Sequence, residues 1–310
     1  MTGMRRYVLT RIAAAIPVVL GATVIVFSIM HLTPGDPVRL ILGFERASPE
    51  RIAEVRAQLG LDQPIYVQYV RWLSGALRGD FGISIAAKRS ASQLIFERLP
   101  YTLELTATAM LISILLGIPL GVISAVKQYT VVDHVSMAVA LFWLSMPVFW
   151  LGLMLMLLFG LRLGWLPISG SSGIKSLIMP ALTLGLPEIG MLARLMRSEM
   201  LEVLREDYIM TARAKGLREL IVMYKHALRN AIISVMVYLF LQIPWLVGGA
   251  VVVETVFAWP GMGRLMYKAI LTKDFPIVQG VIFVIAILTV LFNLLGDIFT
   301  GFLDPRIRYE

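Results

Sequence analysis

The chain has 310 residues, of which 58% are hydrophobic and 15% are charged, and its mean hydropathy is +0.81. A soluble globular domain is about half apolar and about a quarter charged, so this composition excludes an ordinary water-soluble protein and indicates a membrane protein. The absence of cysteine excludes disulfides, thiolate metal sites and a cysteine nucleophile. The net charge of +8 fits nucleic acid or an anionic lipid surface, and the positions of the basic residues decide between them.

Six apolar segments are long enough to cross the hydrocarbon core of a bilayer, which takes about 20 helical residues. Because the bilayer cannot satisfy the backbone, and because the segments lack period-2 alternation, we predict helices and an all-α integral membrane protein. Pro180, Pro187 and Glu188 interrupt the fourth segment, where we expect a kinked or partly buried helix. In the second segment, Gly117 and Gly121 have a spacing that allows close helix packing. The predicted spans are 11–32, 102–126, 135–161, 177–196, 231–257 and 278–303.

The basic residues of the short connecting segments predict the orientation, because cytoplasmic loops carry an excess of lysine and arginine. With the N-terminus inside, thirteen lie in inner segments: Arg5, Arg6, Arg11, Lys127, Arg197, Arg205, Arg213, Lys215, Arg218, Lys225, Arg229, Arg306 and Arg308. Five lie in outer loops: Arg162, Lys175, Arg264, Lys268 and Lys273. We therefore expect both termini in the cytoplasm and no nucleic-acid partner.

The chain is predicted to be one membrane domain with an added helical cap outside the membrane. The expected parts are an anchor helix 1–32, an outer segment 33–101, a five-helix core 102–303 that contains an inner loop 198–230, and a tail 304–310. In the outer segment, Ser48 and Pro49 suit a helix start, a second helix is predicted from about Pro64 to Gly79, and Ser92 is expected to cap a short helix before the second span. The cap either only lies on the membrane or also receives a partner.

Signatures of catalysis are missing from the sequence. Its three histidines are far apart and form no metal-ligand spacing. The segment 170–176 superficially suggests a phosphate-binding loop, but Ile174 stands where a glycine should precede Lys175. We therefore predict no catalytic residue, no metal site and no ATP site in this chain.

Polar residues inside the spans are candidates for a translocation path, because ionisable groups are costly in lipid. Glu188 lies in mid-span and is the first candidate, and Gln242 and Asn293 either line the path with it or bond between helices. We expect three other carboxylates to pair with a neighbouring helix or to lie near the interface: Glu104, Glu254 and Asp297.

The inner loop 198–230 is too polar to cross lipid, yet its pattern is helical. Asp207 is predicted to cap a short helix that starts at Tyr208, and Gly216 to end it in a left-handed conformation. A second helix is expected from Leu217 into the fifth span. Such a helix, continuous with spans at both ends, suits force transmission by a gripping partner, but it equally suits an amphipathic helix on anionic lipid.

At this loop the sequence DYIMTARAKG (207–216) resembles the coupling loop of permeases of the dipeptide/oligopeptide/nickel group of ABC importers. Met210, Thr211 and Ala212 occupy the Glu-Ala-Ala positions of the general family pattern, and Gly216 follows four residues later. The outer segment resembles that of the B-type permease. Other matching stretches, in the expected order, are 32–37, 59–64, 79–82, 226–229, 254–264 and 303–309.

The resemblance implies six transmembrane helices of the type I ABC importer kind in a bacterial inner membrane. It also implies an assembly with a second permease, two ATP-binding subunits that hold ATP and Mg²⁺, and an extracytoplasmic substrate-binding protein, with no cofactor in this chain. The residues that it implies in coupling are Asp207, Tyr208, Thr211, Ala212, Arg213, Ala214, Lys215 and Gly216. Gly216→Val and Asp207→Pro are expected to break coupling.

Peptides are the expected substrate, with glutathione and nickel chelates as alternatives in the same machinery. A stand-alone secondary transporter is the rival from a different class. Such a transporter typically has an inverted repeat and an ionisable relay at the midplane of the membrane. The sequence has no evident repeat.

Overall fold

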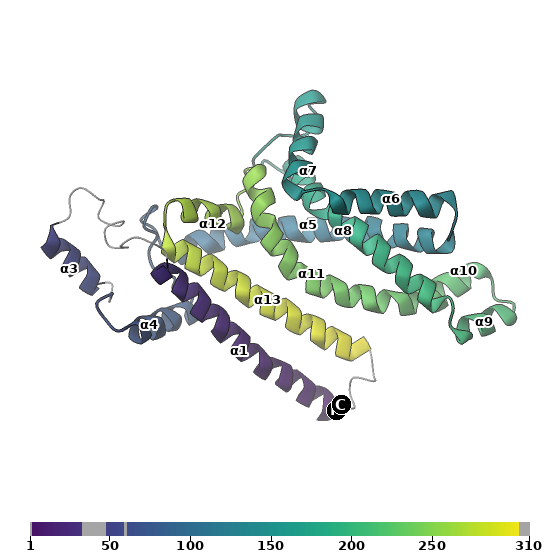
Figure 1. Cartoon of the computed structure of the whole chain (residues 1–310), viewed down its shortest axis with the longest axis horizontal. Coiled ribbons are helices and arrows are strands. Elements are labelled where there is room, and N and C mark those ends of the chain that lie inside the picture. Colours follow the sequence, from purple (N-terminus) through teal and green to yellow (C-terminus); the bar gives the residue numbers. More distant parts are fainter. Residues whose placement is uncertain (1, 33–47, 59–60, 304–310) are drawn as a thin grey trace.

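The computed structural model describes residues 2–32, 48–58 and 61–303, which form helices and turns with one isolated antiparallel bridge, Ile83 to Ser90. The all-α prediction is confirmed. Figure 1 shows an elongated molecule with α9 and α10 at one end and α3, α4 and α12 at the other. The helices are α1 (Thr2–Leu32), α3 (Pro49–Gln58), α4 (Ile65–Leu77), α5 (Ala91–Val126), α6 (Val131–Ser145), α7 (Val148–Leu155), the π-helix η1 (Met156–Arg162), α8 (Ile174–Val203), α9 (Asp207–Ala214), α10 (Glu219–Ile221), the π-helix η2 (Val222–Ala227), α11 (Leu228–Val256), α12 (Met262–Leu271) and α13 (Phe275–Leu303).

Five helical stretches of the described residues are long and apolar enough to cross a membrane, and a sixth is counted if one bent pair is a single span. The five contain α1, α5, α8, α11 and α13. The continuous third span predicted over 135–161 is wrong, because the chain bends by 103° between α6 and the α7–η1 stretch. Pro147 accounts for the break, since the residue before a proline is disfavoured in a helix, and Met146 is extended (φ −83°, ψ 133°).

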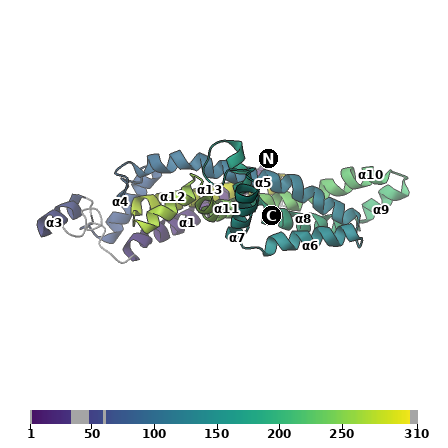
Figure 2. The ribbon, with the colours of Figure 1, turned by 90° about the horizontal axis from the view of Figure 1, so that it is seen from above.

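α8 is the central span of the core. In its apolar window 67% of the residues are buried, against 11% in α1, so the expectation of a partly buried fourth span is confirmed. Figure 2 shows α8 between α5 and α6, and it packs against both. Gly117 and Gly121 make the approach of α5 possible, because a Cβ at Gly117 would lie 2.8 Å from Leu192 Cβ and one at Gly121 would lie 2.5 Å from the Ala193 carbonyl oxygen.

Helix α13 joins the α1 helix to this core. Figure 1 shows α1 running alongside α13, and the two helices are in contact. Arg11 of α1 and Asp297 of α13 form an ion pair at 3.4 Å. Asp297 therefore pairs with a neighbouring helix, as predicted.

The end of the core that lies opposite α9 is closed around Glu254, a fully buried residue near the end of α11. Its carboxylate accepts hydrogen bonds from Thr102 Oγ1 of α5 (2.6 Å) and from the backbone N–H of Arg264 (2.9 Å). Gly261 packs directly on this carboxylate, and a Cβ there would overlap it. The pairing predicted for Glu254 is confirmed, and it explains the glycine in the stretch that follows α11.

The segment before α5 packs against α1 and against the start of α13. Tyr69 of α4 bonds through its hydroxyl to Thr23 Oγ1 of α1 (2.8 Å), and the turn at Ser84 donates hydrogen bonds to the buried carboxylate of Asp274.

The helices predicted from Pro49 and from Pro64 are present, but the expected cap at Ser92 is wrong. Ser90 caps α5, and α5 continues without interruption into the second span. Ser92 Oγ instead accepts a hydrogen bond from the Phe81 backbone N–H (3.0 Å). The predicted features at 33–37, at 59–60 and in the tail 304–310 lie outside the described residues.

Candidate functional site

The short helix α9 lies beyond the ends of α8 and α11 (Figure 1). Its bounds match the prediction to within one residue, and Gly216 follows it in the predicted left-handed conformation (φ +76°). The capping role predicted for Asp207 is wrong. Glu206 holds the N-cap position without a side-chain cap bond, and Asp207 is the first helical residue. At that position its negative charge interacts favourably with the helix dipole.

One face of α9 is buried in the apolar core. Ile209 is fully buried and Ala212 is 7% exposed, and both belong to the same cluster as Met196 and Met200 of α8 and Met223 of η2. Burying an isoleucine side chain contributes about 1.5–3 kcal/mol. A displacement of α9 therefore has to carry the adjoining ends of α8 and α11 with it, or lose this packing.

The opposite face of α9 is open to solvent and partly apolar. Met210 is 56% exposed on this face. Tyr208 is 41% exposed but lies on the flank toward α11, because residues two positions apart on a helix do not share a face. Four further residues of the predicted coupling set are also exposed: Thr211, Arg213, Ala214 and Lys215. Thr211 Oγ1 donates a hydrogen bond to the Asp207 carbonyl oxygen within the helix (3.0 Å). This face offers a partner the apolar Met210 side chain beside polar groups.

Two polar contacts fix the ends of α9, and neither was expected from the sequence. Asn230 Nδ2 of α11 donates to the Tyr208 hydroxyl at 2.7 Å. Arg213 donates from Nη2 and Nε to the Glu219 carboxylate of α10, at 2.7 and 3.2 Å. These hydrogen bonds raise the pKa of Arg213 above its already high value, so this contact is charged throughout the physiological range.

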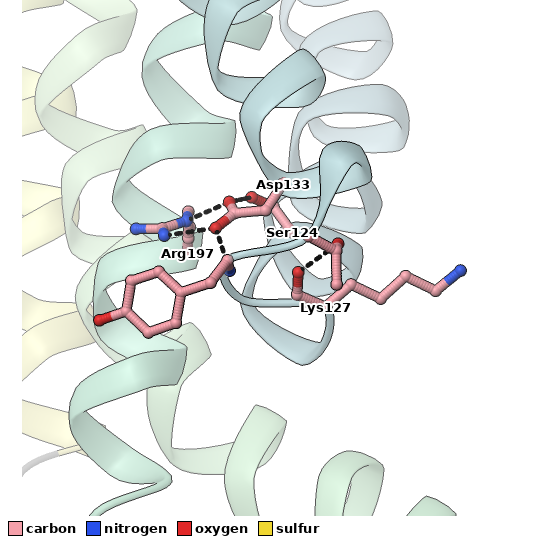
Figure 3. Close-up of polar contacts among 6 residues, drawn as sticks. Ser124, Lys127, Asp133 and Arg197 are labelled. Carbon is pink, nitrogen blue, oxygen red and sulfur yellow. Dashed lines mark hydrogen bonds and ion pairs between the residues drawn. The ribbon is translucent and has the colours of Figure 1, made fainter.

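A partly buried ion pair ties α8, six residues before its end, to the first turn of α6 (Figure 3). Arg197 Nε and Nη2 each donate to one oxygen of Asp133, both at 2.7 Å, and the Asp133 side chain is only 3% exposed. The same carboxylate accepts from Ser124 Oγ and from the Tyr129 backbone N–H (3.0 Å). The α5–α6 turn is thereby fixed to the helix that leads into α9.

The mid-span candidate Glu188 lies at the contact between α8 and α11 and is 8% exposed. Gln242 Nε2 donates to it at 2.7 Å and the Tyr238 hydroxyl donates at 3.2 Å. The structure thus brings Glu188 and Gln242 together, whereas no hydrogen bond within the described residues joins Asn293 of α13 to them. Sequence reasoning missed Tyr238, although its position four residues before Gln242 places it on the same helix face.

Two open pockets flank α9. The first, of about 590 Å³, is lined by Arg197 and Arg205 together with Glu202, Glu206 and Asp207. The second, of about 690 Å³, is lined by residues of α9, η2, α11 and α13, and none of its described lining residues is acidic. No group of three or more potential metal ligands occurs among the residues that the structure describes.

Two family models match the chain and together cover nearly all of it. Residues 117–309 match the binding-protein-dependent transport system inner membrane component, and residues 4–106 match the N-terminal part of this membrane component. Three relatives each match 99% of this chain and 100% of their own length. They are the dipeptide transport system permease protein DppB of Alkalihalophilus pseudofirmus (42% identical), the glutathione transport system permease protein GsiC of Salmonella paratyphi A (43%) and DppB of Escherichia coli (38%).

Solved structures show the same fold at lower identity. A chain of the MetNI methionine ABC transporter in an inward-facing conformation aligns with a TM-score of 0.60 at 19% identity, over 68% of this chain and 97% of that one. A chain of an amino acid ABC transporter aligns with a TM-score of 0.56 at 16% identity, over 67% and 94%. The expected fold is confirmed, and the chain belongs to the family of binding-protein-dependent transport system inner membrane components, as a multi-pass permease subunit of the dipeptide and oligopeptide kind of ABC importer.

Proposed function

We propose that this chain forms half of the translocation path of an importer for dipeptides and related short peptides such as glutathione. Its identity of 42% to a dipeptide permease and 43% to a glutathione permease, both over full length, supports this substrate class. The assembly contains a second permease, two ATP-binding subunits and an extracytoplasmic substrate-binding protein. ATP and Mg²⁺ bind to the ATP-binding subunits, and this chain carries no cofactor.

The coupling role of α9 rests on one observation, the contrast between its two faces. Ile209 and Ala212 anchor it to the ends of α8 and α11, while Met210 and Thr211 are exposed on the outward side. An ATPase subunit that grips the outward face can therefore move the inner ends of the spans. The free energy for this movement comes from ATP binding to that subunit, which favours one conformation of the assembly over the other.

The proposed orientation places α9 and both termini in the cytoplasm. Figure 1 supports it, because α1 begins and α13 ends toward the same side of the molecule as α9. The excess of basic residues in the segments on this side is typical of cytoplasmic loops. Glu188 and Gln242 then lie inside the bilayer at the contact between α8 and α11, where they contribute polar groups to the path. Asn293 contributes to the path from α13.

A single cysteine at position 210 tests the coupling role directly, because the natural sequence contains no cysteine. In the assembled importer, Met210→Cys is expected to form a crosslink to an ATPase subunit with a short thiol-to-amine reagent. Ile174→Cys is the matched control: Ile174 is 82% exposed at the start of α8, so it should give no crosslink to the ATPase and should react with an impermeant maleimide from outside.

Crosslinking of Met210→Cys that changes in yield when ATP is added would support coupling through α9. Equal crosslinking of the Ile174→Cys and Met210→Cys variants to the ATPase, or maleimide labelling of Met210→Cys from outside, would contradict it. The substrate class is tested separately, by uptake of labelled dipeptide, glutathione and nickel into vesicles that contain the assembly and its binding protein.

A further inference from the structure

The second pocket beside α9 combines a basic rim with an apolar wall. The basic rim is lined by Lys225 and His226 of η2 and by Arg229 of α11. The apolar wall is lined by Ile233, Met236 and Phe299. The Phe299 ring of α13 packs on Phe240 of α11 with centroids 4.9 Å apart, so the apolar wall is built from two helices held together.

The pocket lies where a span enters the membrane. The fifth predicted span begins at residue 231, so the three basic or imidazole side chains precede its start and Ile233 and Met236 follow it. Within the described residues, neither Lys225 nor Arg229 has a carboxylate partner. The first pocket differs, because three acidic residues line it beside its two arginines.

From this arrangement we infer that the second pocket binds an anionic phospholipid of the cytoplasmic leaflet, with the headgroup phosphate at Lys225 and Arg229 and the start of an acyl chain along Ile233, Met236 and Phe299. Basic pockets between membrane helices at the cytoplasmic side bind anionic headgroups in this way. The inference goes beyond the transport function, since it concerns the lipid around the permease. It also places a lipid against the exposed Tyr208 end of α9.

Native mass spectrometry of the detergent-purified assembly tests the site, with added phosphatidylglycerol compared with phosphatidylcholine of the same acyl chains. The natural assembly should retain phosphatidylglycerol preferentially. Because each basic side chain near the membrane surface contributes about fivefold to the binding of anionic lipid, Lys225→Gln with Arg229→Gln should weaken its retention about 25-fold. Arg205→Gln with Arg218→Gln removes the same charge from exposed positions outside the pocket and should leave retention within about twofold.

Three results would overturn the inference. The first is an equal loss of phosphatidylglycerol in both double variants, which would indicate general surface charge. The second is loss of the ATPase subunits from Lys225→Gln/Arg229→Gln with lipid retention unchanged, which would assign the basic rim to the ATPase. The third is displacement of the lipid by excess inorganic phosphate, which would indicate a site for small anions. Failure of the coupling proposal would leave the lipid measurement unaffected.

Discussion

Arg197 of α8 and Asp133 of α6 are joined by two parallel hydrogen bonds of 2.7 Å each, although 64 residues separate them in the sequence. Arg197 lies on the helix that leads into α9, and the pair fixes the start of α6, with the α5–α6 turn, to that helix (Figure 3). A force applied at α9 therefore reaches α5 and α6 as well as α8.

Asp133→Asn should destabilise the protein and weaken coupling. Removing one partner of a fully buried ion pair costs about 3–5 kcal/mol, and we expect about 2 kcal/mol here, because the Arg197 side chain is 24% exposed and water relieves part of its charge. Thermal unfolding in detergent measures the stability, and the ratio of peptide imported to ATP hydrolysed measures the coupling.

The matched control for that variant is Glu97→Gln, which removes the exposed ion pair between Arg89 and Glu97 (2.7 Å). Exposed pairs contribute about 0.2–1 kcal/mol, and this one lies outside the proposed force path. A stability loss at Asp133→Asn no larger than that of the control would show that the pair does not fix the turn.

Gly216→Val is expected to uncouple transport from ATP hydrolysis while the protein remains inserted. Gly216 has φ +76°, a conformation that costs an L-residue about 1–2 kcal/mol, and relief of this strain would shift the end of α9. Gly164→Val is the control, because Gly164 also has a positive φ (+63°) and open space around it, but lies between η1 and α8. If both variants lowered the transport-to-hydrolysis ratio equally, strain at Gly216 would have no special link to α9.

Asp207→Pro should be tolerated, in contrast to the expectation from sequence. Asp207 is the first residue of α9, where proline is favoured because its missing N–H has no intrahelical partner. Glu206 before it is already extended (ψ 144°), as a residue before proline prefers. Transport by Asp207→Pro should stay within about twofold of the natural protein, since a change of only about 0.5 kcal/mol is expected. A loss as large as that of Gly216→Val would show that the Asp207 carboxylate or N–H contacts a partner.

The spans and α9 were predictable because their signals are local. Apolar windows mark the spans, and Gly216 marks the end of α9 by its need for a positive φ. The break at Pro147 had no such clear signal. The predicted span 231–257 is as long as 135–161 and also contains a proline, Pro244, yet α11 continues through it.

The polar pairs were not predictable in the same way. Sequence shows that Asp133, Arg197 and Glu188 are polar residues in or near spans, but their partners come from tertiary packing. The relative positions of α5, α6 and α8 have to be known before Asp133 can be identified as the partner of Arg197. Tyr238 and Gln242 share a helix face by their spacing, yet only the packing of α11 on α8 brings that face to Glu188.

Glu188 allows its structural role to be separated from a role in the path. Glu188→Leu leaves the partly buried donors of Tyr238 and Gln242 without an acceptor, at about 1 kcal/mol each, so it should lower the unfolding temperature. Glu188→Gln keeps the shape and an acceptor oxygen, and should change stability by less than about 1 kcal/mol. If Glu188 contributes its carboxyl group to the translocation path, Glu188→Gln will slow peptide uptake although the protein is as stable as the natural one. Unchanged uptake by Glu188→Gln, together with instability of Glu188→Leu, would assign Glu188 to helix packing alone.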